Sequence, residues 1–571
     1  MSRVHTSPVP TGGSPHLSRR VALAQALSCQ QAGYLPEAGC YLEDLLSARA
    51  QDADALHLLG IVRDAQGDAT LGAALIGRAL VGKVTPEFLS NHGMVLGHLG
   101  RHTEALARFD QALAAKPNYP EALNNKGISL EATHRATEAV EVYRLVCHHR
   151  PNYPEALANL GHALLSLNQL AESAEASTSA LALRPDFPEA LTQLAIALRG
   201  LGLPDAAEQA AQRALALLPR DIACHRNLAI TLQMLNRPLE ALAVLDLALA
   251  IAPQDPETHH HRAILLLRAG RFTEGWDEYE WRFKTRQARE AHHHLANSPV
   301  WRGEDIAGRT ILLIPEQGLG DTIQFVRYAA MLAAWGARVI LQTQPPLARL
   351  LHSLRAEITF IPMGTAPDQY DVQCPLLSLP RAFGTDVATI PAMAPYLYAE
   401  PEAVERWRQR LHTDRPGLRV GIVWAGNPRH IDDRQRSLAF AHLAPLWQVP
   451  GVRWFSLQMD ACAADLQTAP DNSPPSGIDD LSLELADFAE TAAALESLDL
   501  LITVDTAIAH LAGALGRPVW VMLPEAADWR WMSGETSPWY PTMRLFRQDR
   551  QTDWTPVLHA VASELGKAAI V

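Results

Sequence analysis

The chain has 571 residues, which is enough for about two to four domains because a single hydrophobic core stops growing well before that length. A formal net charge of −13, from 62 acidic and 49 basic residues, disfavours a protein built around nucleic acid. No apolar run is long enough to span a membrane, and the six scattered cysteines form no CxxC pair, so we expect a cytoplasmic protein with no membrane span and no zinc or redox motif.

The N-terminal segment, residues 1–17, lacks the apolar stretch of a signal peptide, and we expect it to be a disordered leader. A 34-residue period follows. It is carried by the near-copies KPNYPEAL, RPNYPEAL and RPDFPEAL and by five prolines, Pro117, Pro151, Pro185, Pro219 and Pro253. Small residues keep the same period in two rows, one of which starts Gly93, Gly127, Gly161.

This pattern predicts units of two antiparallel helices. The small residues fit where the helices cross, since a larger side chain would push the helices apart, and each proline ends a second helix. The spacing is that of the tetratricopeptide repeat, and the resemblance covers roughly residues 86 to 285. With a weaker helical pair before it, residues 18–290 are predicted to form an α-helical tetratricopeptide solenoid.

Stacked repeats present a groove that binds extended peptides. Candidate groove residues occupy equivalent positions on the first helix of successive repeats, where amides can both donate and accept hydrogen bonds. They are Asn91, Asn125, Asn159, Gln193 and Asn227. The alternative interpretation is that they are merely polar, solvated helix positions.

Two histidine runs, residues 259–261 and 292–294, carry no metal prediction. Adjacent histidines on a helix point in different directions and do not converge on one ion.

From about Arg309 the pattern changes to alternating strands and helices. We expect strands at 310–315, 338–343 and 358–362, with helices at 322–336 and 345–354 between them. A linking helix at 401–411 precedes a second series, with a strand running into a loop at 418–427, strands at 452–458, 500–504, 517–523 and 543–548, and a last helix near 554–567. Two Rossmann-like lobes, residues 300–400 and 401–571, are the simplest architecture.

Three loops would converge at the carboxyl ends of these strands, where such folds bind ligands. The first holds Gly318, Gly320 and Asp321. Its glycines let the backbone approach a ligand, and Asp321 is either a helix cap or a general base. The motif lacks the third glycine of the dinucleotide fingerprint, which disfavours NAD.

The second loop, residues 424–437, follows the first strand of the second lobe and is rich in Arg and His. Its cationic side chains could neutralise a diphosphate, although a solvated charged loop is the simpler alternative. Its residues of interest are Asn427, Arg429, His430, Arg434 and Arg436, and we add Gln458 from the end of the next strand as a donor contact.

The third loop joins a buried strand to a helix start at Asp505, Thr506 and His510. Backbone N–H groups and the helix dipole favour an anion there. Helix capping by Asp505 or Thr506 is the structural alternative.

The motifs GLGD and DTxxxHLAxALGxP together resemble the heptosyltransferase-like glycosyltransferase family 9. The resemblance implies a GT-B fold, inverting transfer without metal or cofactor, Asp321 as the base, and Asp505, Thr506 and His510 at the donor. Heptosyltransferases place a lysine near the donor phosphates, where this chain offers Arg436. The layout is also similar to that of the O-linked N-acetylglucosamine transferases and of bacterial repeat-containing flagellin glycosyltransferases, in which the repeats select a protein acceptor.

The resulting hypothesis is a glycosyltransferase that uses a nucleotide sugar and modifies a protein chosen by the repeats. Two alternatives stay open: a transferase with a saccharide or lipid acceptor, and a repeat adaptor whose α/β part is inactive. The aromatic block at 528–541, with Trp529, Trp531 and Trp539, either lines the ligand site or packs in the core.

Overall fold

The computed structural model describes residues 17–286, 299–365, 367, 369–412, 416–428, 433–459, 477–550 and 553–569. Except for Leu17, the predicted leader lies outside them. The chain divides into two compact units, Met1–Leu217 and Leu218–Val571, which we describe separately. This division falls inside the predicted solenoid, well before the expected boundary between residues 290 and 300.

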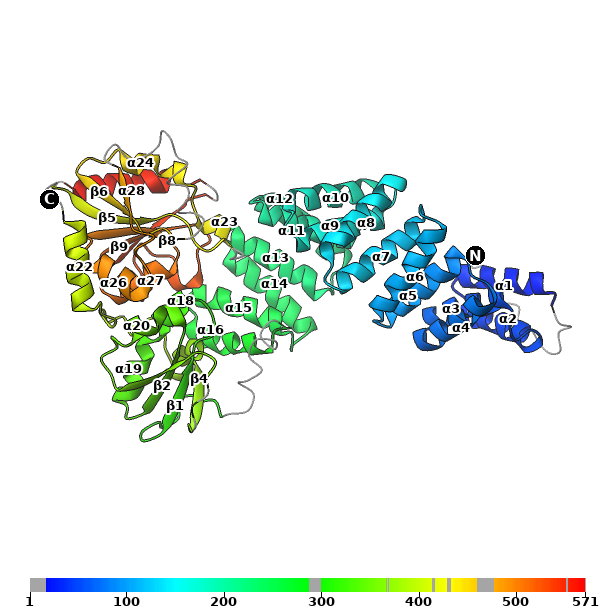
Figure 1. The fold of residues 1–571 in the computed structure, drawn as a ribbon, viewed down its shortest axis with the longest axis horizontal. Coiled ribbons are helices and arrows are strands. Elements are labelled where there is room, and N and C mark those ends of the chain that lie inside the picture. Colours follow the sequence, from blue (N-terminus) through cyan, green and yellow to red (C-terminus); the bar gives the residue numbers. More distant parts are fainter. Residues whose placement is uncertain are drawn as a thin grey trace, which may run out of the picture. The chain divides into compact units, whose positions relative to one another are not determined.

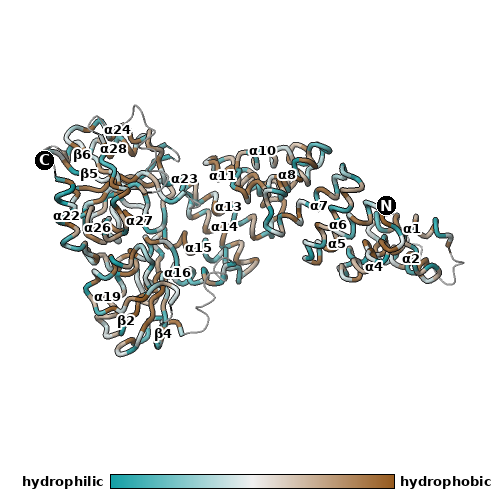
Figure 2. The backbone as a smooth tube through the Cα atoms, in the orientation of Figure 1, coloured by the Kyte–Doolittle hydropathy of each residue, from teal (hydrophilic) through white to brown (hydrophobic). Residues whose placement is uncertain are grey.

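The first unit consists of antiparallel helix pairs (Figure 1). Apolar and polar residues alternate along these helices, as the changing colours of the tube in Figure 2 show, so each helix buries one face. Its helices are α1 (Arg19–Gln31), α2 (Leu35–Ala48), α3 (Ala53–Ala65), α4 (Ala69–Gly82), α5 (Pro86–His98), α6 (His102–Ala115), α7 (Pro120–Ala132), α8 (Ala136–His149), α9 (Pro154–Ser166), α10 (Leu170–Leu183), α11 (Pro188–Gly200) and α12 (Pro204–Leu217).

The periodic glycines lie where two helices of a pair touch. A Cβ atom built on Gly93 would lie 2.7 Å from Cε1 of Phe109, and one built on Gly127 would overlap the Tyr143 ring. Both aromatic rings are buried, so they have no room to retreat. The prediction that small residues mark the helix crossings is therefore confirmed.

The repeated proline turns also follow the prediction. Helix α6 ends at Ala115, two residues before Pro117. Beside that turn the Lys116 ammonium lies 4.1 Å from the centre of the Tyr119 ring, and equivalent cation–π contacts recur one and two repeats later. The turn and its contact are thus repeated with the sequence period.

The second unit begins with two further helix pairs and a short 3-10 helix. In its described residues, the elements up to the first strand are α13 (Ile222–Met234), α14 (Pro238–Ile251), α15 (Pro256–Arg268), α16 (Phe272–Tyr279) and η1 (Glu280–Lys284).

A four-stranded parallel sheet follows, with the strand order β3-β2-β1-β4. Its elements are β1 (Thr310–Ile314), α18 (Leu319–Phe325), α19 (Arg327–Ala334), β2 (Arg338–Thr343), η3 (Pro345–Leu347), α20 (Ala348–Leu351), β3 (Ile358–Pro362), β4 (Val372–Pro375), η4 (Leu376–Ser378), α21 (Leu379–Ala382) and α22 (Pro401–Leu411).

The remaining part of the chain forms a six-stranded parallel sheet in the order β10-β9-β8-β5-β6-β7, so the direction of strand addition reverses between β5 and β8. Its elements are β5 (Leu418–Val423), α23 (Asp433–Arg436), η5 (Phe440–Leu443), α24 (Ala444–Trp447), β6 (Val452–Ser456), β7 (Ile478–Asp480), α26 (Phe488–Glu496), β8 (Leu500–Val504), α27 (Ala507–Ala514), β9 (Val519–Leu523), η7 (Trp529–Trp531), β10 (Met543–Arg547) and α28 (Thr555–Ala568).

Helices cover both faces of this sheet. Alternate residues of β8, Leu500 and Ile502, belong to an apolar cluster with Leu558 of α28, whereas Leu501 belongs to the cluster that includes α26 and α27. Figure 1 shows α24 and α28 on one side of the strands and α26 and α27 on the other. Burial on both faces explains why the strands are continuous apolar runs.

Most strands lie where the sequence predicts them, and two helices differ. The helix expected at 322–336 is two helices separated by Val326, and buried Arg327 donates to the carbonyl oxygen of Gln324 beside this break. The helix expected at 345–354 begins as the 3-10 helix η3, with Pro345 and Pro346 at its first positions, and its helical part ends at Leu351. Strands β4 and β7 and helix α26 were not predicted.

The aromatic block at 528–541 packs in the core. Trp529, Trp531 and Trp539 are at most 2% exposed. The Trp529 ring meets Trp276 of α16 edge-on, with ring centres 5.3 Å apart. This block therefore joins the second sheet to the last helix pair, and core packing is the alternative that holds for its tryptophans.

Candidate active site

The loop that follows β1 places Asp321 at the third position of α18. Gly318, which is exposed, is the residue before the helix, and its backbone N–H donates to the Asp321 carboxylate over 2.9 Å. Asp321 is therefore not the N-cap residue itself, but its side chain does cap the N-terminus. This bond fixes one carboxylate oxygen and leaves the other to a second partner.

That partner is Arg530, which sequence reasoning missed. Its guanidinium donates to Asp321, to Asp528 over 2.9 Å and to Gln324 over 2.9 Å. Burial opposes its charge, but the carboxylates of Asp528 and Asp321 outweigh burial and raise the pKa of Arg530 above its ordinary value. The only sequence signal was its place in the aromatic block, since Asp321 lies 209 residues away.

The predicted loops of the two sheets meet. A Cβ atom built on Gly320 would lie 2.9 Å from Cδ2 of His510 and 3.4 Å from the Cα atom of Ala507. Only glycine lets α18 approach the start of α27 this closely. The carboxyl end of β1 in one sheet thus faces the carboxyl end of β8 in the other, and this junction is the candidate active site.

Gln458, at the end of β6, shapes the loop after β5. It is 3% exposed, and its side-chain oxygen accepts from the backbone N–H groups of Trp424 and Ala425 at 3.1 and 3.0 Å. Its side-chain nitrogen donates to the carbonyl oxygens of Ala425 and Met459. Because the amide is committed to the backbone, we correct the prediction that Gln458 contacts a donor.

Arg436 folds back over Gly426. A Cβ atom built on Gly426 would lie 2.9 Å from Nη2 of Arg436, and Nε of Arg436 lies 3.4 Å from the Asp433 carboxylate. The Arg436 side chain is 17% exposed, so it keeps a surface that a ligand can reach. Asn427 and Arg434 are exposed, and Arg429 and His430 lie outside the described residues.

Asp505 follows β8 and is partly buried. Burial and the neighbouring charge of Asp528 raise its pKa from 3.8 to about 6, although Arg436, the Trp531 indole and Arg530 act in the opposite direction. Because β5 pairs with β8 in parallel, the loops that follow them start side by side, on the two sides of the strand-order reversal. A carboxyl group with this pKa exchanges its proton near neutral pH.

Thr506 and His510 differ from the prediction in detail. Thr506 is the N-cap residue of α27, but its hydroxyl does not cap the helix and lies 3.2 Å from the Thr503 hydroxyl. His510 is 5% exposed, stacks on Trp531 and has Nδ1 3.0 Å from the Tyr540 hydroxyl. Burial and the charges of Arg530 and Arg327 lower its pKa well below 6.5, so His510 is neutral and supplies no positive charge.

The predicted amide ladder is present in the repeats, with internal hydrogen bonds. Asn91 Nδ2 lies 3.0 Å from Nε2 of His57, and Asn159 donates to Asn124 over 3.0 Å. Asn125 and Asn227 are partly buried. Gln193 is 9% exposed and packs against Gly161 in the interior, which makes it a poor groove residue and corrects its prediction.

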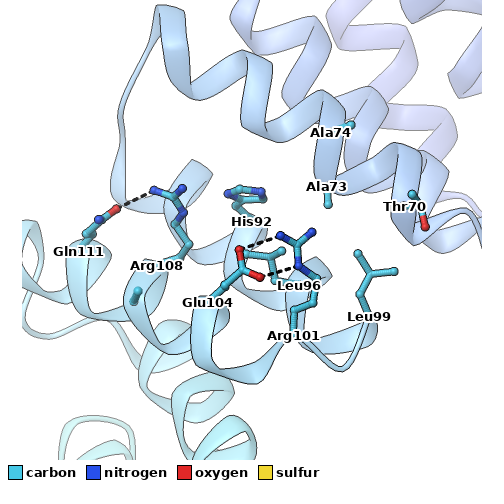
Figure 3. Close-up of a pocket in the computed structure, with 11 residues that line it drawn as sticks. Thr70, Ala73, Ala74, His92, Leu96, Leu99, Arg101, Glu104, Arg108 and Gln111 are labelled. Carbon is cyan, nitrogen blue, oxygen red and sulfur yellow. Dashed lines mark hydrogen bonds and ion pairs between the residues drawn. The ribbon is translucent and has the colours of Figure 1, made fainter.

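A separate pocket lies in the first unit among α4, α5 and α6 (Figure 3). Its volume is about 500 Å³, and His92, Arg101 and Glu104 are among its lining residues. The Arg101–Glu104 ion pair has equivalents at Arg135–Glu138 and in two further repeats. Its charge pattern is therefore a general feature of the repeat, and we assign no ligand to the pocket.

Within the described part of the chain, no group of three or more His, Cys, Asp or Glu side chains is arranged to hold a metal ion. His259 of the first histidine run pairs with Glu278, and residues 292–294 lie outside the described residues. No helix in the described ranges has the length and apolarity needed to cross a bilayer.

Fold and site together define a class of protein: an array of tetratricopeptide repeats followed by two parallel sheets whose strand ends meet. The tetratricopeptide repeat model matches residues 91–156, 158–222 and 192–256, so the repeats are shown. A curated relative is the protein FlbA of Caulobacter vibrioides, 28% identical over 323 residues, which are 52% of this chain and 53% of FlbA. The chain thus matches about half the length of that relative.

Solved structures of tetratricopeptide repeat proteins are also similar. One from Parabacteroides merdae is 17% identical and covers 43% of this chain and 97% of its own, with a TM-score of 0.37. A thermophilic one from Thermus thermophilus is 26% identical and covers 32% of this chain and all of its own, with a TM-score of 0.28.

Proposed function

We propose that the second unit is a glycosyltransferase of the GT-B type, and that the chain transfers a sugar from a nucleotide sugar to a protein bound by the repeats. One observation carries the proposal: carboxyl strand ends of two parallel sheets meet at Gly320 and His510. Parallel sheets bind ligands at this edge and where the strand order reverses. Asp321 follows Gly320 in α18 and is held by Arg530, Asp505 lies in the loop that leads to α27, and Arg436 acts electrostatically on Asp505.

The proposed reaction is a single displacement. An acceptor hydroxyl or amide attacks the anomeric carbon, its proton passes to Asp321, and the bond to the nucleotide phosphate breaks. The departing nucleoside diphosphate carries the negative charge. Arg436 and the N-terminus of α27 lie on the second-sheet side of the junction, where they would stabilise that charge without a metal ion.

Groups from the same loops also orient the carboxylate of Asp321. Arg530 and the Gly318 N–H hold the two carboxylate oxygens of Asp321 in one direction. A base that is fixed in this way loses little orientational freedom when the acceptor binds. The family resemblance implies that His510 helps to hold the donor, and in this scheme it would do so as a neutral side chain.

A donor screen tests the proposal. The full-length protein would be incubated with UDP, GDP, ADP, CMP and dTDP sugars, and thermal stabilisation and donor hydrolysis would be measured. We expect stabilisation by one nucleotide class. No response to any donor would favour the adaptor alternative, and turnover with saccharides or lipids alone would favour the other transferase.

The Asp321→Asn variant tests the base. We expect at least about a 100-fold loss of transfer, with nucleotide binding retained, because the amide cannot accept the proton. Asp277→Asn is the matched control, since that carboxylate is 61% exposed on α16 and pairs with Arg381, whose side chain is itself 39% exposed. Equal turnover of the two variants would remove Asp321 as the base.

The acceptor is proposed to be a protein because tetratricopeptide grooves bind peptides. The ladder amides of Asn91 and Asn159 each use one side-chain donor internally and keep further hydrogen-bonding capacity for a peptide backbone. Flagellin is the acceptor that the layout resemblance suggests. Mass spectrometry of flagellin from cells with and without the gene would test this choice.

A further inference from the structure

The segment that ends the repeat array enters the loop of the candidate base. Arg282 of η1 directs all five of its N–H donors to protein oxygens. Two go to the carboxylate of Glu316, at 2.9 and 2.9 Å, and the others to the Tyr279 carbonyl, Glu280 and the Ser378 hydroxyl. The Arg282 and Glu316 side chains are 6% and 1% exposed.

Glu316 is placed to transmit this contact. It lies two residues before Gly318, at the start of the loop that ends in Asp321. Its carboxylate also accepts from the backbone N–H of Leu377 over 3.2 Å, so it connects the ends of the adjacent strands β1 and β4 to η1. The next residue of the loop, Gln317, is also held by this segment: its side chain donates to the Tyr279 hydroxyl over 3.2 Å.

Burial makes the Glu316 carboxylate dependent on its cationic partner. A buried carboxylate that loses its cation is strongly disfavoured, so Glu316 depends on Arg282 to remain in place. Burial also opposes the charge of Arg282, but the carboxylates of Glu316 and Glu280 outweigh it and raise its pKa. The loop is thus held by a residue that lies outside both sheets.

We propose that Arg282 is a positioning residue of the transferase site, and that the final helix pair with η1 is a fixed part of this site and not of the acceptor-selecting array. The catalytic consequence rests on the proposed function; the positioning of the loop does not. Arg282 acts through Glu316 and does not touch the reacting atoms.

Hydrogen exchange of the full-length chain tests the positioning. In Arg282→Met and in Glu316→Gln, we expect the amides of residues 316–321 to exchange at least about tenfold faster relative to those of β8, because local opening of the loop becomes easier. Arg282→Lys keeps the charge without the planar fork, and should recover part of the protection. Asp277→Asn breaks an exposed ion pair between α16 and α21 and should leave the ratio unchanged.

The exchange rate of the loop relative to that of β8 tests the proposal even if a variant is less stable overall. Global unfolding speeds exchange in the loop and in β8 alike, so a loop that accelerates no more than β8 in both variants would overturn the proposal. If a donor is found, the kcat of Arg282→Met and of Glu316→Gln should be at least about tenfold below that of the parent protein. Their nucleotide affinity should stay within about twofold of the parent value, since the nucleotide is proposed to bind the second sheet. Absence of any donor turnover would count against the proposed function alone.

Discussion

At the residue scale, the charges in the junction are paired, both within one loop and between loops. Arg530 holds Asp321 and Asp528, and Arg436 acts on Asp505. The attraction of Arg436 offsets the burial of Asp505 only in part, so this carboxyl group keeps a raised pKa. It is therefore the group in the junction whose protonation should be most visible in solution.

Asp505 predicts a specific pH dependence of stability. Its pKa rises from 3.8 to about 6 on folding, so between these values the folded protein holds a proton that the unfolded chain releases. The contribution is complete below pH 4, is lost as the pH rises through about 6, and amounts to about 2–3 kcal/mol. Asp505→Asn should lack it, as measured by denaturant unfolding at pH 4.5 to 7.5.

The relevant quantity is the difference in unfolding free energy between the parent protein and Asp505→Asn. It should favour the parent protein most at the low end of this range, fall as the pH rises to about 6, and level off above that pH. Asp277→Asn, with its exposed carboxylate, should follow the parent curve. Parallel curves for the parent and Asp505→Asn would show that Asp505 titrates at its ordinary pKa.

At the element scale, a helix pair depends on what faces its glycine. The Tyr143 ring fills the position where a Cβ of Gly127 would lie, and the Tyr143 hydroxyl donates to Glu131 over 2.8 Å. The ring cannot move without breaking this partly buried hydrogen bond. A Cβ atom built on Gly39 of α2 would meet no atom of another described element within 4 Å, so the same substitution enters open space there.

Gly127→Ala should destabilise its repeat by about 1–3 kcal/mol, because overpacking forces α7 and α8 apart. Gly39→Ala should stabilise α2 by up to about 1 kcal/mol, since alanine is the better helix former. Native-state hydrogen exchange of α7 and α2 measures each effect locally, as repeat arrays open in parts. Equal effects at the two sites would contradict the role of the Tyr143 contact.

At the scale of the whole molecule, the repeat pattern and the compact units do not share a boundary. The 34-residue period continues to Pro253, but the chain divides between Leu217 and Leu218. Within the second unit, the last helix pair makes an aromatic contact with the block at 528–541. Trp276 and Tyr279 pack against Trp529, which is 2% exposed.

Two truncations should therefore behave differently. A chain of residues 218–571 should fold and keep nucleotide binding, while losing modification of a protein acceptor. A chain of residues 286–571 should be insoluble or strongly destabilised, because removing α16 and η1 exposes Trp529 and leaves Glu316 without Arg282. Soluble yield, circular dichroism and nucleotide titration distinguish the two.

Comparable folding of the two truncated chains would show that the last helix pair is dispensable. Modification of a protein by the longer truncated chain at the full-length rate would contradict acceptor selection by the upstream repeats.

The sequence by itself determined the repeats and most strands, because both depend on local periodicity. A small residue every 34 positions and the continuous apolar runs of the strands are visible in the chain. It also indicated the loops of Asp321 and Asp505, which follow buried strands. Strands β4 and β7 were missed because they are short and their residues carry no clear alternation.

Only the tertiary structure decided what these loop residues do. Arg530 meets Asp321 across 209 residues, and Arg282 meets Glu316 across 34, so no local pattern reveals either pair. Gln458, Gln193 and His510 are polar in sequence but are buried by elements from elsewhere in the chain. The burial and charge pairing of a residue depend on all the neighbours that folding brings to it. Periodicity, in contrast, is a property of the chain alone.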